Sequence, residues 1–430
     1  MCFVGDSITH AGSYHSYIYL YYLTRFPERE IRVINKGLSG GQSRGTLNRF
    51  STDIATTQPT VTTIMLGMND VGRHFYGEKN KTDPKAMELK QKALDRYRQQ
   101  MPKIIRNLQD LGSEVILITP SIYDQTMQGA THNYIGVNDA LADCRQFILS
   151  SVKLMSLSYV DFYKSMLQIN AQVQAQNPTD TIVGKDRVHP TQELGHFIMA
   201  YEFLKSQKLP QYVSKVTLDI NKSKALNTIN ATLSKLALSE KKISFSLKAQ
   251  SLPFPQTPAF AKALALVPFT EELNQEVLII KNLTPGEYNL SIDGRSISSF
   301  SASDLADGVN LALEENTPQY QQALEVSRLN EKRRQLQLQL RDAAFTFYTS
   351  GLYKNNSIDL NDQEAVKAFL DKHVESRIHT QSYKYHKMKA ANFLITQKNK
   401  QKILRELESL HQKIYSLNQT HVHHYSLTKK

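Results

Sequence analysis

Short apolar runs alternate with longer segments of helical periodicity through the first half of this 430-residue chain. The apolar runs lie at 2–4, 32–34, 61–66, 114–119 and 159–162, and the helical patterns lie at 14–25, 43–56, 84–111 and 136–152. Strands that are separated by crossover helices pair in parallel, because the chain must return to the same end of the sheet. The alternation therefore predicts an α/β domain over residues 1–209, with a parallel five-stranded sheet covered on both faces.

The block Gly5-Asp6-Ser7-Ile8 follows the first apolar run and places a serine at the carboxyl edge of this sheet. Open parallel sheets bind their ligands at that edge. Gly5 lets the backbone turn sharply where the strand ends, and a helix is predicted soon after it. Ser7 is therefore a candidate nucleophile, although Gly, Asp and Ser are also the commonest residues of ordinary turns.

Two more blocks reach the same edge. Asn35-Lys36-Gly37-Leu38-Ser39-Gly40 follows the second run, and the Gly40 N–H can approach a substrate oxygen because no side chain blocks it. Gly67-Met68-Asn69-Asp70 follows the third run, and the Asn69 amide can donate to a developing oxyanion without a titrating proton. Taken singly, the second block also fits a flexible loop and the third a cap.

The fourth block is Asp186-Arg187-Val188-His189-Pro190, which leads into a helical pattern at 192–206. Asp186 stands three residues before His189, so both side chains can point into one pocket from one loop. Imidazole titrates near neutrality, and a neighbouring carboxylate can fix its tautomer and stabilise the imidazolium. An isolated His-Pro is usually a surface turn, but here the other parts of a serine mechanism stand upstream.

The four blocks, in this order, resemble those of the SGNH hydrolases, also called the GDSL esterase/lipase family. The resemblance covers about residues 1–209 and implies a flavodoxin-like three-layer fold. It implies a catalytic triad of Ser7, Asp186 and His189, and an oxyanion hole formed by Ser7, Gly40 and Asn69. Serine chemistry of this kind implies no cofactor and no metal.

Ile8 stands where the family usually has leucine, a form that resembles its carbohydrate-esterase branch. We therefore expect hydrolysis of short acyl esters, acetyl first, on a carbohydrate or another small ester. The candidate substrate-binding residues are Asp6, His10, Tyr14, His132 and Asn133. A lipase, a thioesterase or an O-acyltransferase would use the same acyl-enzyme. A non-catalytic glycan-binding protein on this scaffold would have no chemical need for Asp186 and His189 together.

The pattern changes after residue 209. Short alternating stretches and turn signals predict a small antiparallel β-rich module at 210–315. Long segments rich in Gln, Lys, Arg, Leu and Glu predict a helical C-terminal region at 316–430, with helices at 319–348, 363–375 and 382–417. A coiled coil would also fit this pattern, but a helical hairpin packed on the rest of the protein is the commoner outcome for so short a heptad run.

The net charge of +12 raises the question of a nucleic-acid partner. Much of the excess lies at 382–430, where charge runs usually solvate a helix face, and no tryptophan or zinc-finger spacing accompanies it, so we expect no nucleic-acid function.

No stretch is long and apolar enough to span a bilayer. Two cysteines exclude a disulfide framework. The short segment before Ser7 leaves no room for a signal peptide, which indicates the cytoplasm unless an export segment has been lost, in which case the protein is secreted or periplasmic. The sequence does not indicate an oligomeric state.

Overall fold

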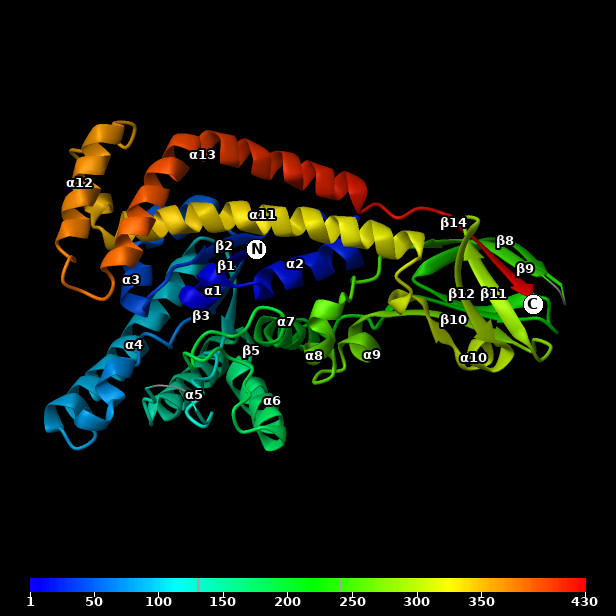
Figure 1. Ribbon diagram of the computed structural model, residues 1–430, viewed down its shortest axis with the longest axis horizontal. Coiled ribbons are helices and arrows are strands. Elements are labelled where there is room, and N and C mark those ends of the chain that lie inside the picture. Colours follow the sequence, from blue (N-terminus) through cyan, green and yellow to red (C-terminus); the bar gives the residue numbers. More distant parts are fainter. Residues whose placement is uncertain (130–131, 240–241) are drawn as a thin grey trace. The chain divides into compact units, whose positions relative to one another are not determined.

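The computed structural model describes residues 1–129, 132–239 and 242–430 (Figure 1). Its first sheet is parallel and consists of β1 (Cys2–Gly5), β2 (Ile34–Gly37), β3 (Val61–Met65), β4 (Glu114–Ile118) and β5 (Ser158–Val160). The strand order is β2-β1-β3-β4-β5, which is the doubly wound order of flavodoxin-like folds. The predicted parallel five-stranded α/β fold is therefore confirmed.

Helices follow the strands as the alternation predicted. They are α1 (Ser7–Ala11), α2 (Tyr14–Arg25), α3 (Ser43–Asn48), α4 (Pro84–Asp110), α5 (Val137–Met155), α6 (Phe162–Gln176) and α7 (Gly195–Ser206). In α4 the buried residues Tyr97, Met101, Ile104 and Leu108 recur at helical spacing and form one apolar face. The Asp83 side chain caps the start of α4 by accepting the Lys85 N–H.

The register of the sheet brings three strand ends to one level. Gly5 at the end of β1 is the partner of Gly37 in β2 and of Met65 in β3. Because the three strands are parallel, the chain leaves all of them at the same edge. Ser7, Gly40 and Asn69 each follow one of these strand ends within a few residues.

The structure corrects three boundaries. The helix predicted at 43–56 is divided into α3, a π-helical turn η1 (Phe50–Ile54) and a 3₁₀ turn η2 (Ala55–Thr57). Strand β2 begins at Ile34 because it pairs with β1 from Cys2 onward, so it runs through the polar residues that follow the predicted strand. The helix predicted from residue 192 begins at Gly195, and α6 was not predicted. The remaining short turns before α4 are η3 (Arg73–Tyr76) and η4 (Glu78–Asn80).

The β-rich module contains two sheets. One has the order β13-β10-β6-β7 and the other the order β12-β11-β14-β9-β8. The strands are β6 (Tyr212–Asp219), β7 (Lys224–Ile229), β8 (Ala231–Leu238), β9 (Lys242–Ala249), β10 (Gln275–Lys281), β11 (Glu287–Ile292), β12 (Arg295–Ser301), β13 (Val309–Asn310) and β14 (His423–Lys429). Pairing in both sheets is antiparallel except between β10 and β6. The last strand of the chain, β14, lies between β11 and β9, far from the predicted module in sequence.

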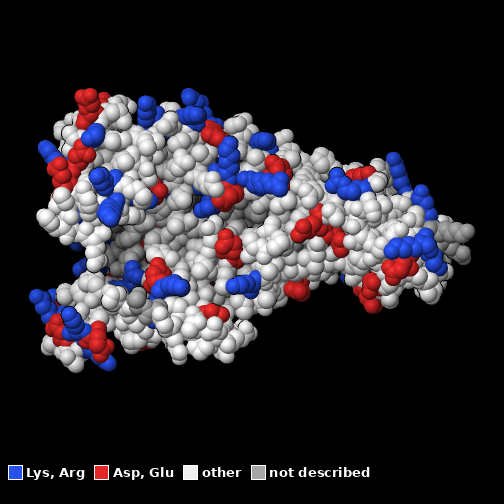
Figure 2. All heavy atoms as spheres, viewed as in Figure 1, with Lys and Arg blue, Asp and Glu red and all other residues white. Residues whose placement is uncertain are grey.

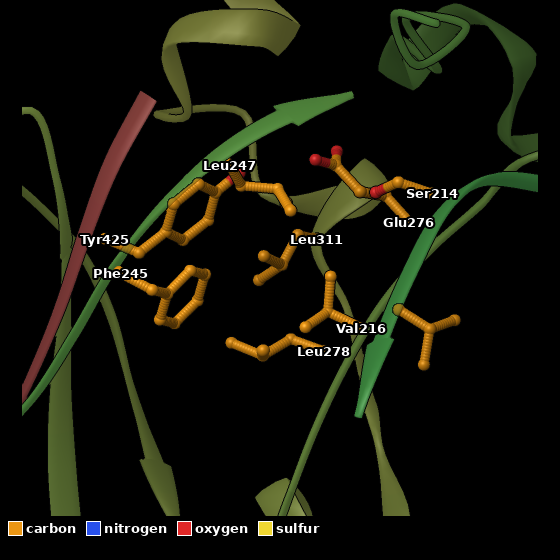
Figure 3. Close-up of a pocket in the computed structure, with 9 residues that line it drawn as sticks. Ser214, Val216, Phe245, Leu247, Glu276, Leu278, Leu311 and Tyr425 are labelled. Carbon is orange, nitrogen blue, oxygen red and sulfur yellow. The ribbon is translucent and has the colours of Figure 1, made fainter. Parts of the chain in front are cut away.

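Short helical segments connect these strands. They are η5 (Pro258–Phe260), α8 (Ala261–Leu264), α9 (Phe269–Leu273), α10 (Ala302–Asp307) and η6 (Leu311–Leu313). A small cavity of about 10 Å³, room for about one water molecule, lies in the apolar core of the module (Figure 3). Phe245 and Tyr425, whose rings stack with centroids 4.9 Å apart, and the Glu276 side chain contribute to its wall.

The helical C-terminal region consists of α11 (Pro318–Thr349), η7 (Leu352–Lys354), α12 (Gln363–Glu375) and α13 (Tyr383–Leu417). The chain forms two compact units. The first consists of Met1–His15, Arg32–Glu202 and Arg333–Ser409, and the second of Ser16–Ile31, Phe203–Lys332 and Leu410–Lys430. The helical region contributes residues to both units, and the predicted division at 1–209, 210–315 and 316–430 stays a prediction.

Charged side chains of both signs are interspersed on the face shown in Figure 2, where blue and red groups alternate rather than form one continuous band. None of the helices in the described parts of the chain has the length and apolar character that crossing a membrane requires.

Candidate active site

Ser7 is the first residue of α1 and lies where β1 ends. Asp6 precedes it and caps the helix, because the Asp6 carboxylate accepts the Ile8 N–H at 2.9 Å. Gly5 is required by packing, since a Cβ at this position would lie 2.2 Å from Thr9 Oγ1 and 2.9 Å from the Met65 carbonyl. The close packing that holds the partly buried Ser7 at the sheet edge therefore depends on the glycine two residues before it.

His189 and Asp186 come from the loop between α6 and α7. The Gly184 N–H donates to the His189 carbonyl at 2.7 Å, and the backbone of Val183 pairs with that of Pro190, so the loop is closed on itself. One Asp186 oxygen accepts the backbone N–H groups of Val188 and His189, both at 3.0 Å. These bonds hold the carboxylate beside the imidazole of the same loop.

The three side chains form a continuous chain of hydrogen bonds. His189 Nε2 lies 2.8 Å from Ser7 Oγ, and His189 Nδ1 bonds to the other Asp186 oxygen. A carboxylate only accepts, so the neutral imidazole carries its proton on Nδ1 and offers Nε2 to the serine hydroxyl. Burial raises the pKa of Asp186, but hydrogen bonds from the His189 ring and from the two backbone N–H groups outweigh it and hold that pKa below its ordinary value. Asp186 is therefore ionised, and it can stabilise an imidazolium.

The loops after β2 and β3 lie against this serine. The Leu38 N–H donates to the Gly5 carbonyl at 3.0 Å, and a Cβ at Gly41 would lie 3.4 Å from the Asp6 Cα. Gly40 is exposed and has a φ of +70°, a left-handed conformation that favours glycine. A Cβ at Gly40 would meet nothing within 4 Å, so its backbone conformation rather than crowding selects glycine.

Asn69 connects the loop after β3 to the loop after β2. Its side-chain Nδ2 donates to the Gly41 carbonyl at 3.2 Å, and the Gln42 side chain donates to the Asn69 carbonyl at 2.8 Å. An amide nitrogen has two protons, so the second remains for another acceptor. The neighbouring Asp70 accepts both the N–H and the hydroxyl of Ser43, at 2.8 and 2.6 Å, and so attaches the start of α3.

Comparisons with known proteins identify relatives of this chain. Residues 1–203 match the GDSL-like lipase/acylhydrolase family. The solved structure of a gut microbial diltiazem-metabolizing enzyme is 30% identical and has a TM-score of 0.86, over 100% of this chain and 97% of that one. The acetylxylan esterase of Geobacillus stearothermophilus is 26% identical over 220 residues, which are 48% of this chain and 92% of the esterase. The chain belongs to the GDSL-like lipase/acylhydrolase family.

Membership of this family, the SGNH hydrolases, makes the protein a carboxylic ester hydrolase. The resemblance predicted from the four blocks is thereby confirmed. The structure brings Ser7, His189 and Asp186 together and attaches the Gly40 and Asn69 loops to the same sheet edge.

Three of the predicted substrate-binding residues of this SGNH hydrolase are buried. Asp6, His10 and Tyr14 are 2, 2 and 0% exposed, so little of their surface faces solvent, and their role in binding substrate stays a prediction. Asp6 is occupied in capping α1, and Tyr14 bonds to Thr9 Oγ1 at 3.0 Å while its ring stacks on His196. They are buried because α1 and the start of α2 lie against the sheet.

The other two substrate-binding candidates lie in the loop that follows β4. His132 is exposed, and the Asn133 side chain donates to the Gln125 carbonyl at 2.7 Å. Because β4 belongs to the same parallel sheet, this loop leaves the same edge as Ser7. Their role in binding substrate stays a prediction.

The residues that anchor the His189 loop were not predicted from the sequence. The Asp124 N–H donates to the Arg187 carbonyl at 2.9 Å, and the Arg187 guanidinium donates to the Asp124 carbonyl at 2.8 Å. The Asp124 carboxylate accepts three further side chains, Asn170, Gln174 and Thr181, at 2.6–3.1 Å. Arg187 stands inside the fourth block, but nothing in the sequence indicated Asp124 as its partner.

Proposed function

We propose that this SGNH hydrolase is a serine esterase in which Ser7 is the nucleophile, His189 the general base and acid, and Asp186 the carboxylate that orients the imidazole. The observation that carries the proposal is the continuous hydrogen-bonded chain from Asp186 through His189 to Ser7 Oγ at the carboxyl edge of the sheet. A nucleophile, a base within hydrogen-bond reach and a group that orients the base are the parts that acyl transfer requires.

The reaction proceeds through an acyl-enzyme. Ser7 Oγ bonds to the ester carbonyl carbon while its proton moves to His189 Nε2, and the carbonyl oxygen becomes an oxyanion. The carbon–oxygen bond to the alcohol then breaks, and the alcohol leaves with the proton from His189. A water molecule repeats the sequence with His189 as base, which releases the carboxylic acid and restores the Ser7 hydroxyl.

The oxyanion hole of this proposal consists of the N–H groups of Ser7 and Gly40 and the Asn69 amide. Ser7 begins a helix, where backbone N–H groups have no partner inside the helix. Gly40 is exposed, and Asn69 retains a second amide proton beside its bond to Gly41. Donors that are held in place before reaction stabilise the charge of the transition state without reorganisation.

The substrate of this proposal is a short acyl ester, acetyl first, on a carbohydrate. The His189 and Asp186 side chains are 44 and 52% exposed, so a large alcohol can approach the triad from solvent. A long acyl chain would instead need an apolar channel around these residues. The similarity of residues 1–203 to an esterase family that includes an acetylxylan esterase supports the acetyl group and the saccharide.

The triad is tested with Ser7→Ala and His189→Ala in the full chain, with His421→Ala as a control at an exposed histidine. Both active-site variants should lose at least ~1,000-fold in kcat on p-nitrophenyl acetate, because each removes a member of a unit that acts together. The control should keep the wild-type rate, and circular dichroism should show that all three variants are folded. Undiminished turnover in either active-site variant would overturn the assignment.

Substrate class is tested by comparing acetate release from acetylated xylo-oligosaccharides with hydrolysis of p-nitrophenyl acetate, p-nitrophenyl octanoate and acetyl-CoA. We expect the acetylated saccharides to have the highest kcat/KM. A preference for acyl chains of eight or more carbons would reject the saccharide and leave the serine esterase chemistry. Diltiazem belongs in the same panel because of the full-length similarity to a diltiazem-metabolizing enzyme. Mass spectrometry with added xylose separates hydrolysis from transfer of the acyl group to a sugar.

A further inference from the structure

Two adjacent residues of α11 are connected to the loop that carries Gly40, here called the Gly40 loop and defined as residues 37–41. Arg341 contacts this loop directly, and Asp342 contacts it through His10. Arg341 is 5% exposed, and its Nε donates to the Gly37 carbonyl at 3.0 Å. Its two terminal nitrogens donate to the two oxygens of Asp53 at 2.8 and 3.0 Å. A planar guanidinium can make these three bonds at once, whereas a lysine ammonium cannot reproduce their geometry.

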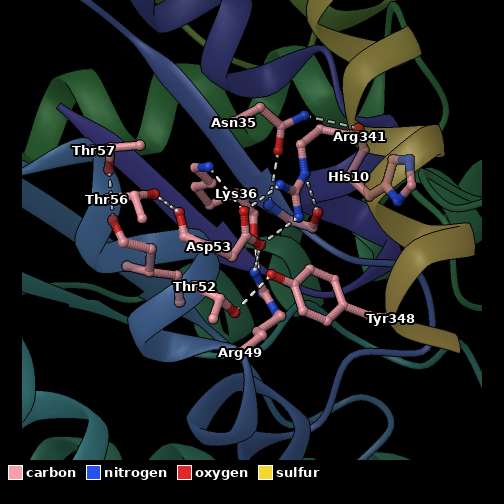
Figure 4. Close-up of polar contacts among 12 residues, drawn as sticks. His10, Asn35, Lys36, Arg49, Thr52, Asp53, Thr56, Thr57, Arg341 and Tyr348 are labelled. Atoms are coloured by element: carbon pink, nitrogen blue, oxygen red, sulfur yellow. Dashed lines mark hydrogen bonds and ion pairs between the residues drawn. The ribbon is translucent and has the colours of Figure 1, made fainter. Parts of the chain in front are cut away.

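Three basic side chains bond to the Asp53 carboxylate near the end of β2. Lys36 Nζ lies 2.8 Å and Arg49 Nη1 lies 2.5 Å from its carboxylate, and the dashed contacts in Figure 4 converge on it. Arg49 also donates to the Lys36 carbonyl at 2.8 Å. Burial raises the pKa of Asp53, but Arg341, Arg49 and Lys36 outweigh it and hold that pKa far below its ordinary value. Successive carbonyls at the end of β2 are thus held by two arginines that share one carboxylate.

A second set of contacts connects α11 to the Gly40 loop through Asp342 and His10. An Asp342 oxygen lies 3.0 Å from His10 Nε2 and also bonds to Lys389 of α13. His10 Nδ1 accepts the Ser39 N–H at 3.0 Å and lies 3.1 Å from the Ser39 hydroxyl. Because the backbone N–H can only donate, the neutral His10 carries its proton on Nε2, and this N–H donates a hydrogen bond to Asp342.

These two sets of contacts reach the Gly40 loop at two residues that precede Gly40. Arg341 holds the carbonyl of Gly37, and Asp342, through His10, holds the N–H of Ser39, which immediately precedes Gly40. A Cβ at Gly37 would lie 2.2 Å from the His10 N–H nitrogen, so the loop lies directly on α1. Gly40 has no neighbour within 4 Å of its Cβ position, so the contacts that fix it come through residues 37–39 on one side and through Gly41 on the other.

We propose that Arg341 and Asp342 are positioning residues that set the direction of the Gly40 N–H, so that residues 333–409 complete the catalytic unit of this esterase. The inference rests on the proposed function, since it requires Gly40 to be an oxyanion donor. A displacement of about 1 Å in a catalytic group can lower the rate by about 100-fold, even when the substituted residue is remote from the chemistry. The helical C-terminal region would then act on catalysis without touching the substrate.

The test uses the full chain with Arg341→Lys, Asp342→Ala and Asp342→Asn, and with Arg328→Lys as the control on the same helix, where the side chain is 67% exposed. We expect Arg341→Lys and Asp342→Ala to lower kcat on p-nitrophenyl acetate by ~10-fold or more, with KM changed by about twofold or less. Asp342→Asn keeps an oxygen acceptor for His10 and should recover part of the loss. The control should be unchanged.

A boronic acid inhibitor distinguishes a misplaced oxyanion donor from a general disturbance of the folded structure. Its tetrahedral adduct on Ser7 places an oxygen in the oxyanion hole, so its inhibition constant should weaken in proportion to the loss of kcat/KM in Arg341→Lys and Asp342→Ala. Wild-type kcat in both variants, or a lower kcat with unchanged boronate inhibition, would overturn the inference. A thermal unfolding curve shows whether a variant is unfolded at the assay temperature. If one variant is unfolded, the test of the inference rests on the variant that remains folded. If wild-type activity persists in Ser7→Ala, the proposed function has failed instead.

Discussion

Replacing Asp6 by asparagine should make the protein more stable above pH 6. Asp6 is 2% exposed beside the candidate nucleophile, and burial raises its pKa from 3.8 to about 6. The Ile8 N–H and the charge of His189 oppose this rise, and the charge of Asp70 adds to it. Asparagine can still accept the Ile8 N–H as a helix cap, but it carries no charge that must be buried.

The magnitude follows from proton linkage. The raised pKa means that the folded protein binds a proton more tightly than the unfolded chain, so stability falls as the pH rises from about 4 to about 6 and then stays level. At about 1.4 kcal/mol for each pH unit, the loss amounts to about 3 kcal/mol. Asp6→Asn lacks this loss, so its advantage should be near zero at pH 4 and up to about 3 kcal/mol at pH 8.

The measurement is urea unfolding followed by circular dichroism at pH 4, 5, 6, 7 and 8, for the wild type, Asp6→Asn and Asp180→Asn. Asp180 is exposed and serves as the matched control, for which we expect a difference within about 0.5 kcal/mol at every pH. A destabilised Asp6→Asn at pH 8, or a difference that does not change with pH, would refute the argument that burial of this charge is costly.

The same substitution should lower activity while it raises stability. At pH 8 Asp6 is ionised, and its charge interacts favourably with protonated His189. Loss of that charge removes part of the stabilisation of the imidazolium that forms in the transition state, so kcat/KM should fall roughly 3- to 10-fold. An active site that retains a costly buried charge for catalysis is the usual form of a trade-off between stability and activity.

Two further predictions concern the other loops of the site. Asn69→Ala should lower kcat on p-nitrophenyl acetate by ~100-fold with a smaller change in KM, because the amide acts mainly on transition-state charge; a rise in KM at constant kcat would make Asn69 a substrate-binding residue instead. Asp124→Ala should remove the carboxylate that bonds to Thr181 in the His189 loop, lower kcat by ~10-fold through misplacement of His189, and lower the Tm by several degrees, whereas unchanged kcat would show that the loop holds its geometry without this carboxylate.

The fold of the first half could be predicted because its signals are local. The apolar runs that precede Ser7 and Asn69 are buried strands, and β-branched or apolar composition indicates such strands without knowledge of their neighbours. The helix Tyr14–Arg25 agrees with its predicted range for the same reason. The predicted helix 43–56 is divided instead, and its second half contains Asp53, whose carboxylate bonds to Lys36 and Arg341, 17 and 288 residues away. Periodicity within a short window contains no information about such partners.

The candidate site divides in the same way. Asp186 and His189 are three residues apart, so one loop can hold both, and their spacing indicated the pair from the sequence. His10 was a candidate substrate-binding residue because its polarity is visible in the sequence and its burial is not. Its partner Asp342 is 332 residues away, and no pattern in the helical region indicated that it would meet the Gly40 loop.

By itself, the sequence determined which groups can carry out the chemistry, because the strand pattern, the glycines of the turns and the Asp-x-x-His spacing are properties of neighbouring residues. The tertiary structure alone decided what surrounds those groups. Arg341 reaches the Gly37 carbonyl across 304 residues, and Arg187 meets Asp124 across 63. Such contacts form only when the packing of apolar faces has brought distant segments together. Apolar packing depends little on which polar side chains it places beside one another.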